Sequence, residues 1–95
     1  MLPDPSIASS GFARNLTTPF VEGSPAQEVN VRFGERLQIL RVQNALSQQE
    51  LASRMVMPVE YLAAIEAGNR SASIVDLDGF AHVFKVSISS LLQGV

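Results

Sequence analysis

The sequence lacks cysteine, and His82 is its single histidine. Without cysteine there are no disulfides, no thiol nucleophile and no cysteine ligands for zinc, and one histidine cannot form a metal-binding cluster. No pair of nucleophile and base, no paired catalytic carboxylates and no phosphate-binding glycine loop is visible. We therefore expect no metal, no cofactor and no enzymatic activity, and we interpret His82 as a surface side chain.

Long apolar segments are also missing. No run of about 18 apolar residues is present, which excludes a membrane-spanning helix. Residues 1–5 lack the basic start and the apolar stretch of a secretory signal, so we expect a cytoplasmic protein.

The third absence is an excess of basic residues. Seven Lys and Arg stand against nine Asp and Glu, for a net charge of −2. A dedicated nucleic-acid binder more often carries a basic excess, so the composition weighs against purely electrostatic DNA binding.

The chain divides near residue 30. Residues 1–29 hold all but one of the five prolines and show no helical repeat of apolar residues, which predicts an extended or flexible tail. Residues 16–21 in this tail are suited to add an edge strand to a protein partner. Residues 30–95 have the composition of one small domain.

Helical patterns begin at the same point. Phe33, Leu37 and Leu40 recur at the spacing of one helix face, which predicts a first helix capped by Asn30 and ending near Asn44.

Two short helices are predicted next. Ser47 followed by Glu50 is the reciprocal cap that opens a helix, expected over residues 48–55. Pro58 is best tolerated at a helix start and Gly68 at a helix end, which predicts a third helix between them.

Two further caps complete the prediction. Ser73 caps a fourth helix through Asp76, and Ser87 caps a last short helix before Gly94. The fold class is therefore expected to be all-α, with five helices and no strand.

Several residues of this region occur in one characteristic order: Ser47-Gln48-Gln49-Glu50-Leu51-Ala52, Leu62, Ile65-Glu66-Ala67-Gly68, Leu77, Ala81 and Val86-Ser87. In this order and spacing they resemble the phage repressor/Cro family of XRE-type regulators, over about two-thirds of the chain. The resemblance implies a repressor-like helix-turn-helix domain that binds double-stranded DNA. It further implies a transcriptional regulator, expected to be a repressor, that acts as a homodimer on a palindromic operator.

The resemblance also implies which residues act. Arg41 and Glu66 match a structural ion pair between the first helix and the recognition helix. Gln48, at the start of the second helix, matches a phosphate-binding position. The candidate DNA contacts are Gln48, Gln49, Arg54, Pro58, Val59, Glu60, Tyr61, Ala64, Asn69 and Arg70, and Arg32 and Arg36 are further candidates for phosphate contacts.

The sequence departs from the family in two places. The third helix lacks the Gln, Asn, Arg or Lys side chains that usually read bases, so a simple helix surface remains an alternative interpretation of Val59, Ala63 and Ala64. Val56 stands in the turn where the family usually has glycine, and we expect the turn to be reshaped because a β-branched residue is disfavoured in the left-handed conformation.

The end of the chain is rich in apolar residues. Ile88, Leu91, Leu92 and Val95 offer more apolar surface than five short helices are expected to cover, and the family commonly dimerises here. These four residues are the candidate dimer interface, and packing into the core is the alternative interpretation.

Two alternatives remain open. The domain is electrically neutral from residue 30 onward, which suits a protein-interaction module that keeps the fold but binds a protein through the third helix or the tail. The other alternative is an antitoxin whose tail covers a toxin and whose domain represses its own operon.

Overall fold

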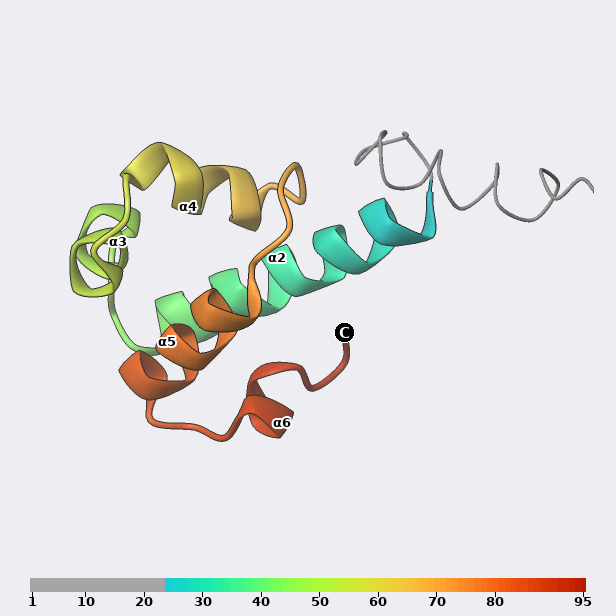
Figure 1. Cartoon of the computed structure of the whole chain (residues 1–95). Helices are drawn as coiled ribbons and strands as arrows, with labels where there is room; N and C mark the ends of the chain where they lie inside the picture. The colour runs from blue at the N-terminus through green and yellow to red at the C-terminus, as the bar shows by residue number, and fades with distance from the viewer. Residues whose placement is uncertain (1–23) are drawn as a thin grey trace, which may run out of the picture.

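The computed structural model describes residues 24–95, and these form five helices with no strand among them. This confirms the predicted all-α fold class. In chain order the helices are α2 (Pro25–Gln43), α3 (Gln48–Met55), α4 (Val59–Glu66), α5 (Ile74–Phe84) and α6 (Ile88–Leu91) (Figure 1). The tail predicted over residues 1–29 lies outside the described residues except for its last six positions.

Helix α2 begins earlier than the sequence suggested. Its N-cap is Ser24, whose Oγ accepts a hydrogen bond from the Gln27 backbone N–H at 3.1 Å, and Pro25 occupies the first helical position. Serine followed by proline is a strong helix start, because proline has no N–H that would be left unbonded there. The prediction that Asn30 caps the helix was therefore wrong. Asn30 is instead buried within α2, where its Oδ1 accepts from the Ser71 hydroxyl at 3.1 Å.

The later helix caps agree with the sequence prediction. Ser47 and Glu50 form a complete capping box at α3, and Ser73 and Asp76 form a second one at α5. Ser87 caps α6 through the Ser90 backbone N–H at 3.0 Å. These local bonds satisfy backbone N–H groups that have no partner within the helix, which fixes where each helix begins.

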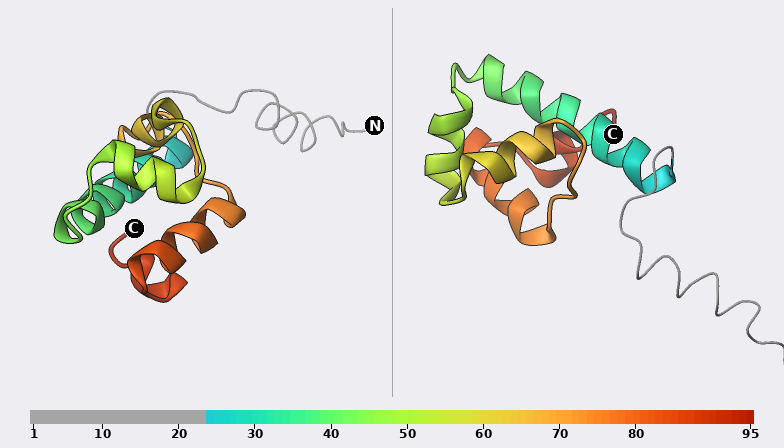
Figure 2. Two further views of the ribbon diagram at one scale, coloured as in Figure 1. Left: turned by 90° about the vertical axis from the view of Figure 1, so that its left-hand side faces the viewer. Right: turned by 90° about the horizontal axis from the view of Figure 1, so that it is seen from above.

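The core lies between α2 and the other four helices. In Figures 1 and 2, α4 runs along one side of α2, while α5 and α6 lie on the other side with the C-terminus returning to α2. The Phe33 and Phe80 rings, 6.2 Å apart between centroids, join α2 to α5. The residues with no exposed surface are Leu37, Leu51, Leu62, Ile65, Phe80 and Leu91. No helix of residues 24–95 is both long and apolar enough to cross a membrane.

A glycine allows the close approach of α2 to α4. A Cβ placed on Gly34 would collide with the Glu66 carbonyl oxygen and lie 2.7 Å from the Ile65 carbonyl oxygen. Backbone atoms at the end of α4 therefore lie directly against α2, and this contact fixes the position of α4 over the bundle.

The turn between α3 and α4 keeps the left-handed conformation. Val56 has φ 56° and ψ 50°, so the expectation of a reshaped turn was wrong. The N–H groups of Val56 and Met57 donate to the Ser53 and Ala52 carbonyls at 3.2 and 3.0 Å and close the helix end. The valine side chain is 91% exposed, so its strain stays local to the backbone.

Candidate nucleic-acid interface

Helix α4 packs one face against the bundle, and its other face points away from the bundle. Leu62, Ile65 and Glu66 are buried against the bundle, whereas Pro58 and Glu60 are exposed. Val59, Tyr61, Ala63 and Ala64 lie between these extremes. The inward residues are three and four positions apart, as expected for a helix that packs along one stripe. Of the residues predicted to meet DNA, Pro58, Glu60 and Ala64 therefore lie on the outward side, whereas Val59 and Tyr61 also pack against the core.

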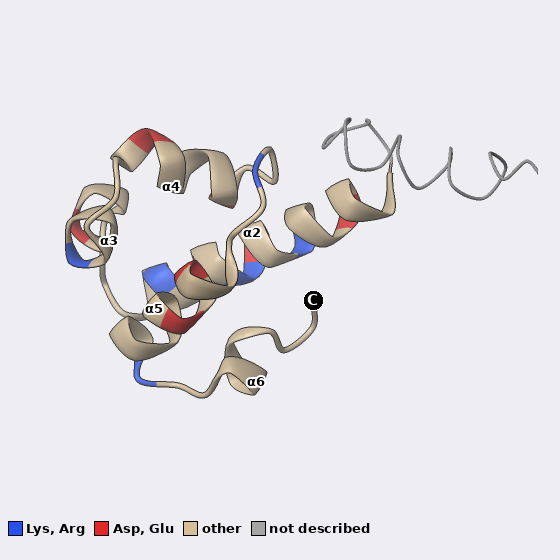
Figure 3. Cartoon of the chain, viewed as in Figure 1, with Lys and Arg blue, Asp and Glu red and all other residues tan. Residues whose placement is uncertain are grey.

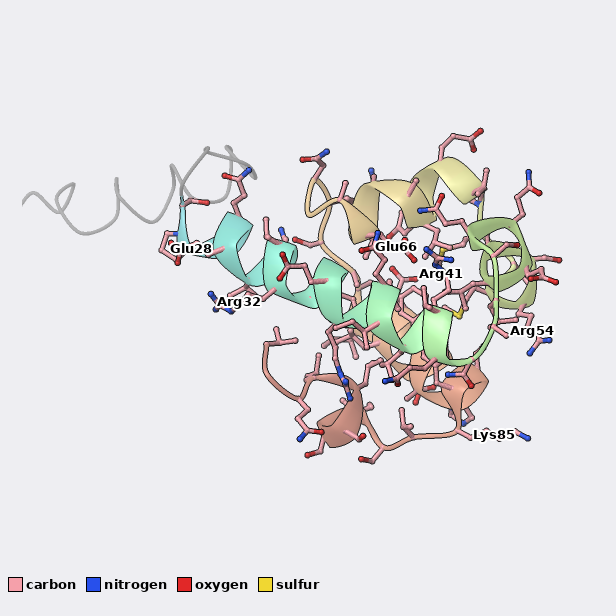
Figure 4. The ribbon with its side chains drawn as sticks, turned by 180° about the vertical axis from the view of Figure 1, so that it is seen from behind. Glu28, Arg32, Arg41, Arg54, Glu66 and Lys85 are labelled. Atoms are coloured by element: carbon pink, nitrogen blue, oxygen red, sulfur yellow. The ribbon has the colours of Figure 1, made fainter. Side chains whose placement is uncertain are left out.

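The back of α4 is held by a buried ion pair. Arg41 Nε lies 2.7 Å from Glu66 Oε2, and Arg41 Nη2 donates to Glu66 Oε1 at 3.3 Å (Figure 4). The same guanidinium donates to the Leu46 carbonyl at 2.9 Å. The side chains are only 14% and 1% exposed, and the pair joins α2 to α4 at the two positions to which the family resemblance pointed.

Gln48 joins this buried pair. Its Nε2 donates to Glu66 Oε1 at 2.9 Å, which connects the first residue of α3 to the back of α4. The side-chain amide is thus engaged within the protein. The backbone N–H groups of Gln48 and Gln49 lie in the first turn of α3, where no helical carbonyl is available to them. The groups at this helix end that suit a phosphate are therefore the backbone N–H groups.

A second cluster lies on the opposite side of α4. The Tyr61 hydroxyl donates to Asp76 Oδ2 at 2.8 Å, and the Arg70 guanidinium lies over the Tyr61 ring at 4.4 Å from its centroid. Asp76 Oδ2 also accepts from the Ser73 N–H at 3.0 Å as part of the α5 capping box. The sequence singled out Tyr61 and Arg70 separately, whereas Asp76 was recognised only as a cap.

The basic residues lie on several separate elements. Figure 3 marks them on α2, on α3 and in the segments after α4 and α5. Arg36 donates to the Ser90 and Leu91 carbonyls at 2.8 and 3.4 Å, so it holds α6 and the prediction of a phosphate contact for it was wrong. Arg32 projects from the side of α2 away from α4 (Figure 4). Arg54 and Arg70 remain as exposed cations near α3 and α4.

One carboxyl group at this surface has a shifted pKa. The backbone and side-chain hydrogen bonds from Ser47 lower the pKa of Glu50 below its ordinary value, with a smaller contribution from the nearby Arg54 charge. Glu50 is therefore held in its charged form at the start of α3, where a negative charge also complements the helix dipole.

The predicted dimer residues separate into two groups. Leu91 has no exposed surface and belongs to the core, so its assignment to a dimer interface was wrong. Leu92 and Val95 are half-buried, and Ile88 is 41% exposed. Further exposed apolar side chains were not singled out from the sequence, among them Ile39 and Val42 on α2 and Ile74 and Val75 on α5. They lie on α2 and α5, and the sequence of these helices does not show which of their apolar residues face the core. The packing of the helices decides this.

Comparison with known proteins agrees with this geometry. The helix-turn-helix family model matches residues 37–91. The chain is 29% identical to the control protein C.MunI of Mycoplasma sp over 69 residues, which cover 72% of this chain and 93% of that protein. It is 29% identical to the HTH-type transcriptional regulator DdrOP3 of Deinococcus deserti over 65 residues, 68% of this chain and 50% of that protein.

Solved structures show the same fold. The restriction-modification controller protein C.AhdI from Aeromonas hydrophila is 32% identical, with a TM-score of 0.63 over 65% of this chain and 94% of that one. The clp gene regulator ClgR from Corynebacterium glutamicum is 23% identical, with a TM-score of 0.66 over 68% of this chain and 69% of that one. The outward α4, the Arg41–Glu66 pair and these matches together show that the chain belongs to the helix-turn-helix family of DNA-binding transcription regulators, of the phage repressor/Cro (XRE) type.

Proposed function

We propose that this protein is a sequence-specific transcriptional repressor that binds a palindromic operator as a homodimer. The observation that carries the proposal is the outward face of α4, with the start of α3 held beside it by the bond from Gln48 to Glu66. In this arrangement α4 enters the major groove while the end of α3 meets the adjacent phosphates.

The start of α3 and three exposed side chains contact the DNA phosphates. The backbone N–H groups of Gln48 and Gln49 bind one phosphate at the start of α3, where the helix dipole favours an anion. Arg54, Asn69 and Arg70, all exposed, add contacts on either side of α4. These contacts set the register of the protein on the duplex and carry no base information themselves.

Base contacts are fewer. Val59 and Ala64 offer methyl groups to thymine, Glu60 accepts from a cytosine amino group, and Pro58 sits at the tip of the helix. Tyr61 is engaged within the protein, because Asp76 accepts from its hydroxyl and Arg70 lies over its ring, so it meets DNA through Arg70 rather than through a base contact of its own. With so few polar readers, we expect much of the specificity to come from the shape and deformability of the operator.

The operator is found by selection of bound duplexes from random sequence. We expect an enriched palindrome whose half-site centres lie one helical turn apart, because two α4 helices of a symmetric dimer must reach the same face of the DNA. An enriched single half-site would contradict the dimer, and no enrichment would contradict sequence-specific binding.

For the dimer surface we propose Ile88, Leu92 and Val95. Ile88 is the most exposed of the three, so Ile88→Asp tests the interface without introducing a charge into the core. We expect this variant to elute as a monomer in gel filtration. Ile74→Asp is the matched control, because Ile74 is 82% exposed at the far end of α5. A dimer lost in Ile74→Asp and kept in Ile88→Asp would move the interface to the start of α5.

The regulated genes are a second part of the proposal. One similar protein is described as a control protein and another as a restriction-modification controller protein, and both are matched over nearly their whole length. We propose that this chain regulates genes of a restriction-modification system. Reading frames for a restriction enzyme and its methyltransferase next to this gene support that role, and a neighbouring toxin frame supports the antitoxin alternative.

The scattered basic residues favour one competing function, a protein-interaction module. Binding to a mixed pool of genomic DNA at several salt concentrations separates the two. A DNA-binding regulator loses affinity as salt rises, because bound phosphates release counterions. A chain that binds no DNA even at low salt would instead use α4 to contact a protein.

A further inference from the structure

Tyr61 is engaged at both ends of its side chain. Its hydroxyl donates to Asp76 Oδ2 at 2.8 Å, and its ring supports the Arg70 guanidinium at 4.4 Å from the centroid. Tyr61 therefore connects three elements of the interface: α4, the loop that follows α4, and the N-terminus of α5. A cation over an aromatic face at this distance is an attractive contact.

Arg70 has no other partner within residues 24–95. It forms no hydrogen bond and no ion pair with any residue of this part of the chain, and it is exposed. A guanidinium held by a ring contact alone keeps its N–H groups available for another partner. Those N–H groups match the oxygens of a phosphate in a paired geometry.

Asp76 anchors the ring without binding Arg70. Its Oδ2 accepts from the Tyr61 hydroxyl and from the Ser73 N–H, and the capping box fixes its position at the start of α5. The capping box of α3 has no such third partner, because within residues 24–95 the Glu50 carboxylate is hydrogen-bonded by Ser47 alone. The additional bond from Tyr61 is thus specific to the capping box beside Arg70.

We propose that Tyr61 is a positioning residue for DNA binding. Asp76 fixes its hydroxyl, its ring holds the Arg70 guanidinium, and the unbonded N–H groups of the guanidinium are thereby presented to a backbone phosphate beside α4. This role rests on the DNA-binding function proposed above. A side chain that is already oriented loses less freedom on binding, which strengthens the contact.

The test is the salt dependence of binding to a short fluorescein-labelled DNA duplex of mixed sequence. A phosphate contact needs no particular operator, so this duplex is a sufficient probe. Arg70→Gln is expected to lower the slope of log affinity against log salt by about one. Tyr61→Leu is expected to lower the slope similarly, and adding Arg70→Gln to Tyr61→Leu is expected to change it little further. Tyr61→Phe keeps the ring and is expected to retain most of the slope.

Arg54→Gln is the matched control, since Arg54 is also exposed but has no ring beneath it. Its effect on the slope is expected to add fully to that of Tyr61→Leu. Thermal unfolding of each variant by circular dichroism identifies any loss of fold, and a merely structural role of Tyr61 would not make the Arg70 effect disappear selectively.

Three outcomes overturn the proposal. A Tyr61→Leu variant that keeps the wild-type slope shows that the ring does not position Arg70, and independent addition of the Tyr61→Leu and Arg70→Gln effects shows the same. In both cases the DNA-binding function stands. Absence of binding by the wild-type chain at low salt overturns the DNA-binding function and this role together.

Discussion

The two sides of α4 are held by similar sets of residues in different surroundings. On the back, Arg41, Glu66 and Gln48 form a network whose carboxylate is 1% exposed. On the front, Arg70, Tyr61 and Asp76 form a cluster in which the arginine is exposed and rests on a ring. Each set contains an arginine and a carboxylate, and each joins α4 to another helix.

The difference lies in whether arginine and carboxylate meet. On the back they bind each other directly, so neither charge is available to a ligand. On the front the guanidinium lies over the tyrosine ring, and its N–H groups have no hydrogen-bond partner among residues 24–95. Burial thus turns one set into a fixed support, while exposure leaves the other suited to contact DNA.

Removing a partner from the back network is expected to have the largest effect. Arg41→Ala leaves the buried Glu66 carboxylate without its cation, and we expect a loss of about 3 kcal/mol or more in the free energy of unfolding. Urea unfolding measures this. Arg54→Ala, which removes an exposed arginine, is the control and is expected to change stability by less than about 0.5 kcal/mol. Equal effects of the two substitutions would contradict the difference between the two sides.

Gly34→Ala tests the closeness of α2 and α4 next to this network. Alanine favours helix, but its Cβ would collide with the backbone carbonyls of Ile65 and Glu66, which cannot move independently of α4. We expect a net destabilisation of about 2 kcal/mol in urea unfolding.

Gly79→Ala is the matched control for Gly34→Ala. Its Cβ would meet only the end of the Met55 side chain, at 2.8 Å from Cε, and that flexible end can shift. A neutral or slightly stabilising change is expected. A loss at Gly79 equal to that at Gly34 would argue against a specific backbone contact at the α2–α4 crossing.

On the front of α4 the expected effect on stability is smaller. Tyr61→Phe removes the hydrogen bond to Asp76 but keeps the ring and the core unchanged, so we expect a loss of about 1 kcal/mol. Thermal unfolding measures it. A loss as large as that of Arg41→Ala would mean that the front cluster is also a main support of the fold.

A substitution in the turn before α4 is expected to raise the stability of the protein instead of lowering it. Val56 holds φ 56° with its side chain exposed, and glycine adopts this conformation without the steric penalty. We expect Val56→Gly to stabilise the protein by about 1 kcal/mol, measured by thermal unfolding. A loss of stability would show that the valine side chain contributes more than its exposure indicates.

The smallest predicted effect depends on pH. Because the pKa of Glu50 is lower in the folded state, its capping box stabilises the protein above the ordinary glutamate pKa of about 4.3. That contribution is lost as the pH falls through the lower pKa of the folded state, where the carboxylate takes up a proton. Unfolding of Glu50→Gln from neutral pH downward is expected to depend less on pH than unfolding of the wild type. Identical pH profiles would contradict the role of the charged carboxylate.

The sequence predicted those features that local bonds decide. The starts of α3, α5 and α6 follow from serine caps, and the end of α4 from Gly68, because each needs only residues a few positions apart. The start of α2 was misplaced because two local signals competed. The apolar repeat begins only at Phe33, whereas Ser24 and Pro25 open the helix without apolar neighbours.

The candidate site was predicted in part. The Arg41–Glu66 pair followed from the family pattern, and the structure contains it. Arg36 and Leu91 were misjudged because their surroundings come from distant parts of the chain. Arg36 binds carbonyl groups 54 and 55 positions away, and Leu91 packs into the core, and the residues next to each in the sequence do not indicate this. The contact DNA makes with Gln48, Arg54 and Arg70 stays a prediction.

By itself the sequence determined the helical class, the helix boundaries that depend on caps, and the family. The tertiary structure alone decided which charged and aromatic side chains meet: Gln48 with Glu66, Arg36 with α6, and Tyr61 with both Arg70 and Asp76. The physical reason is the range of the interactions. A cap or a turn acts over a few residues of one segment, whereas these contacts join residues that become neighbours only when the apolar faces of separate helices pack together.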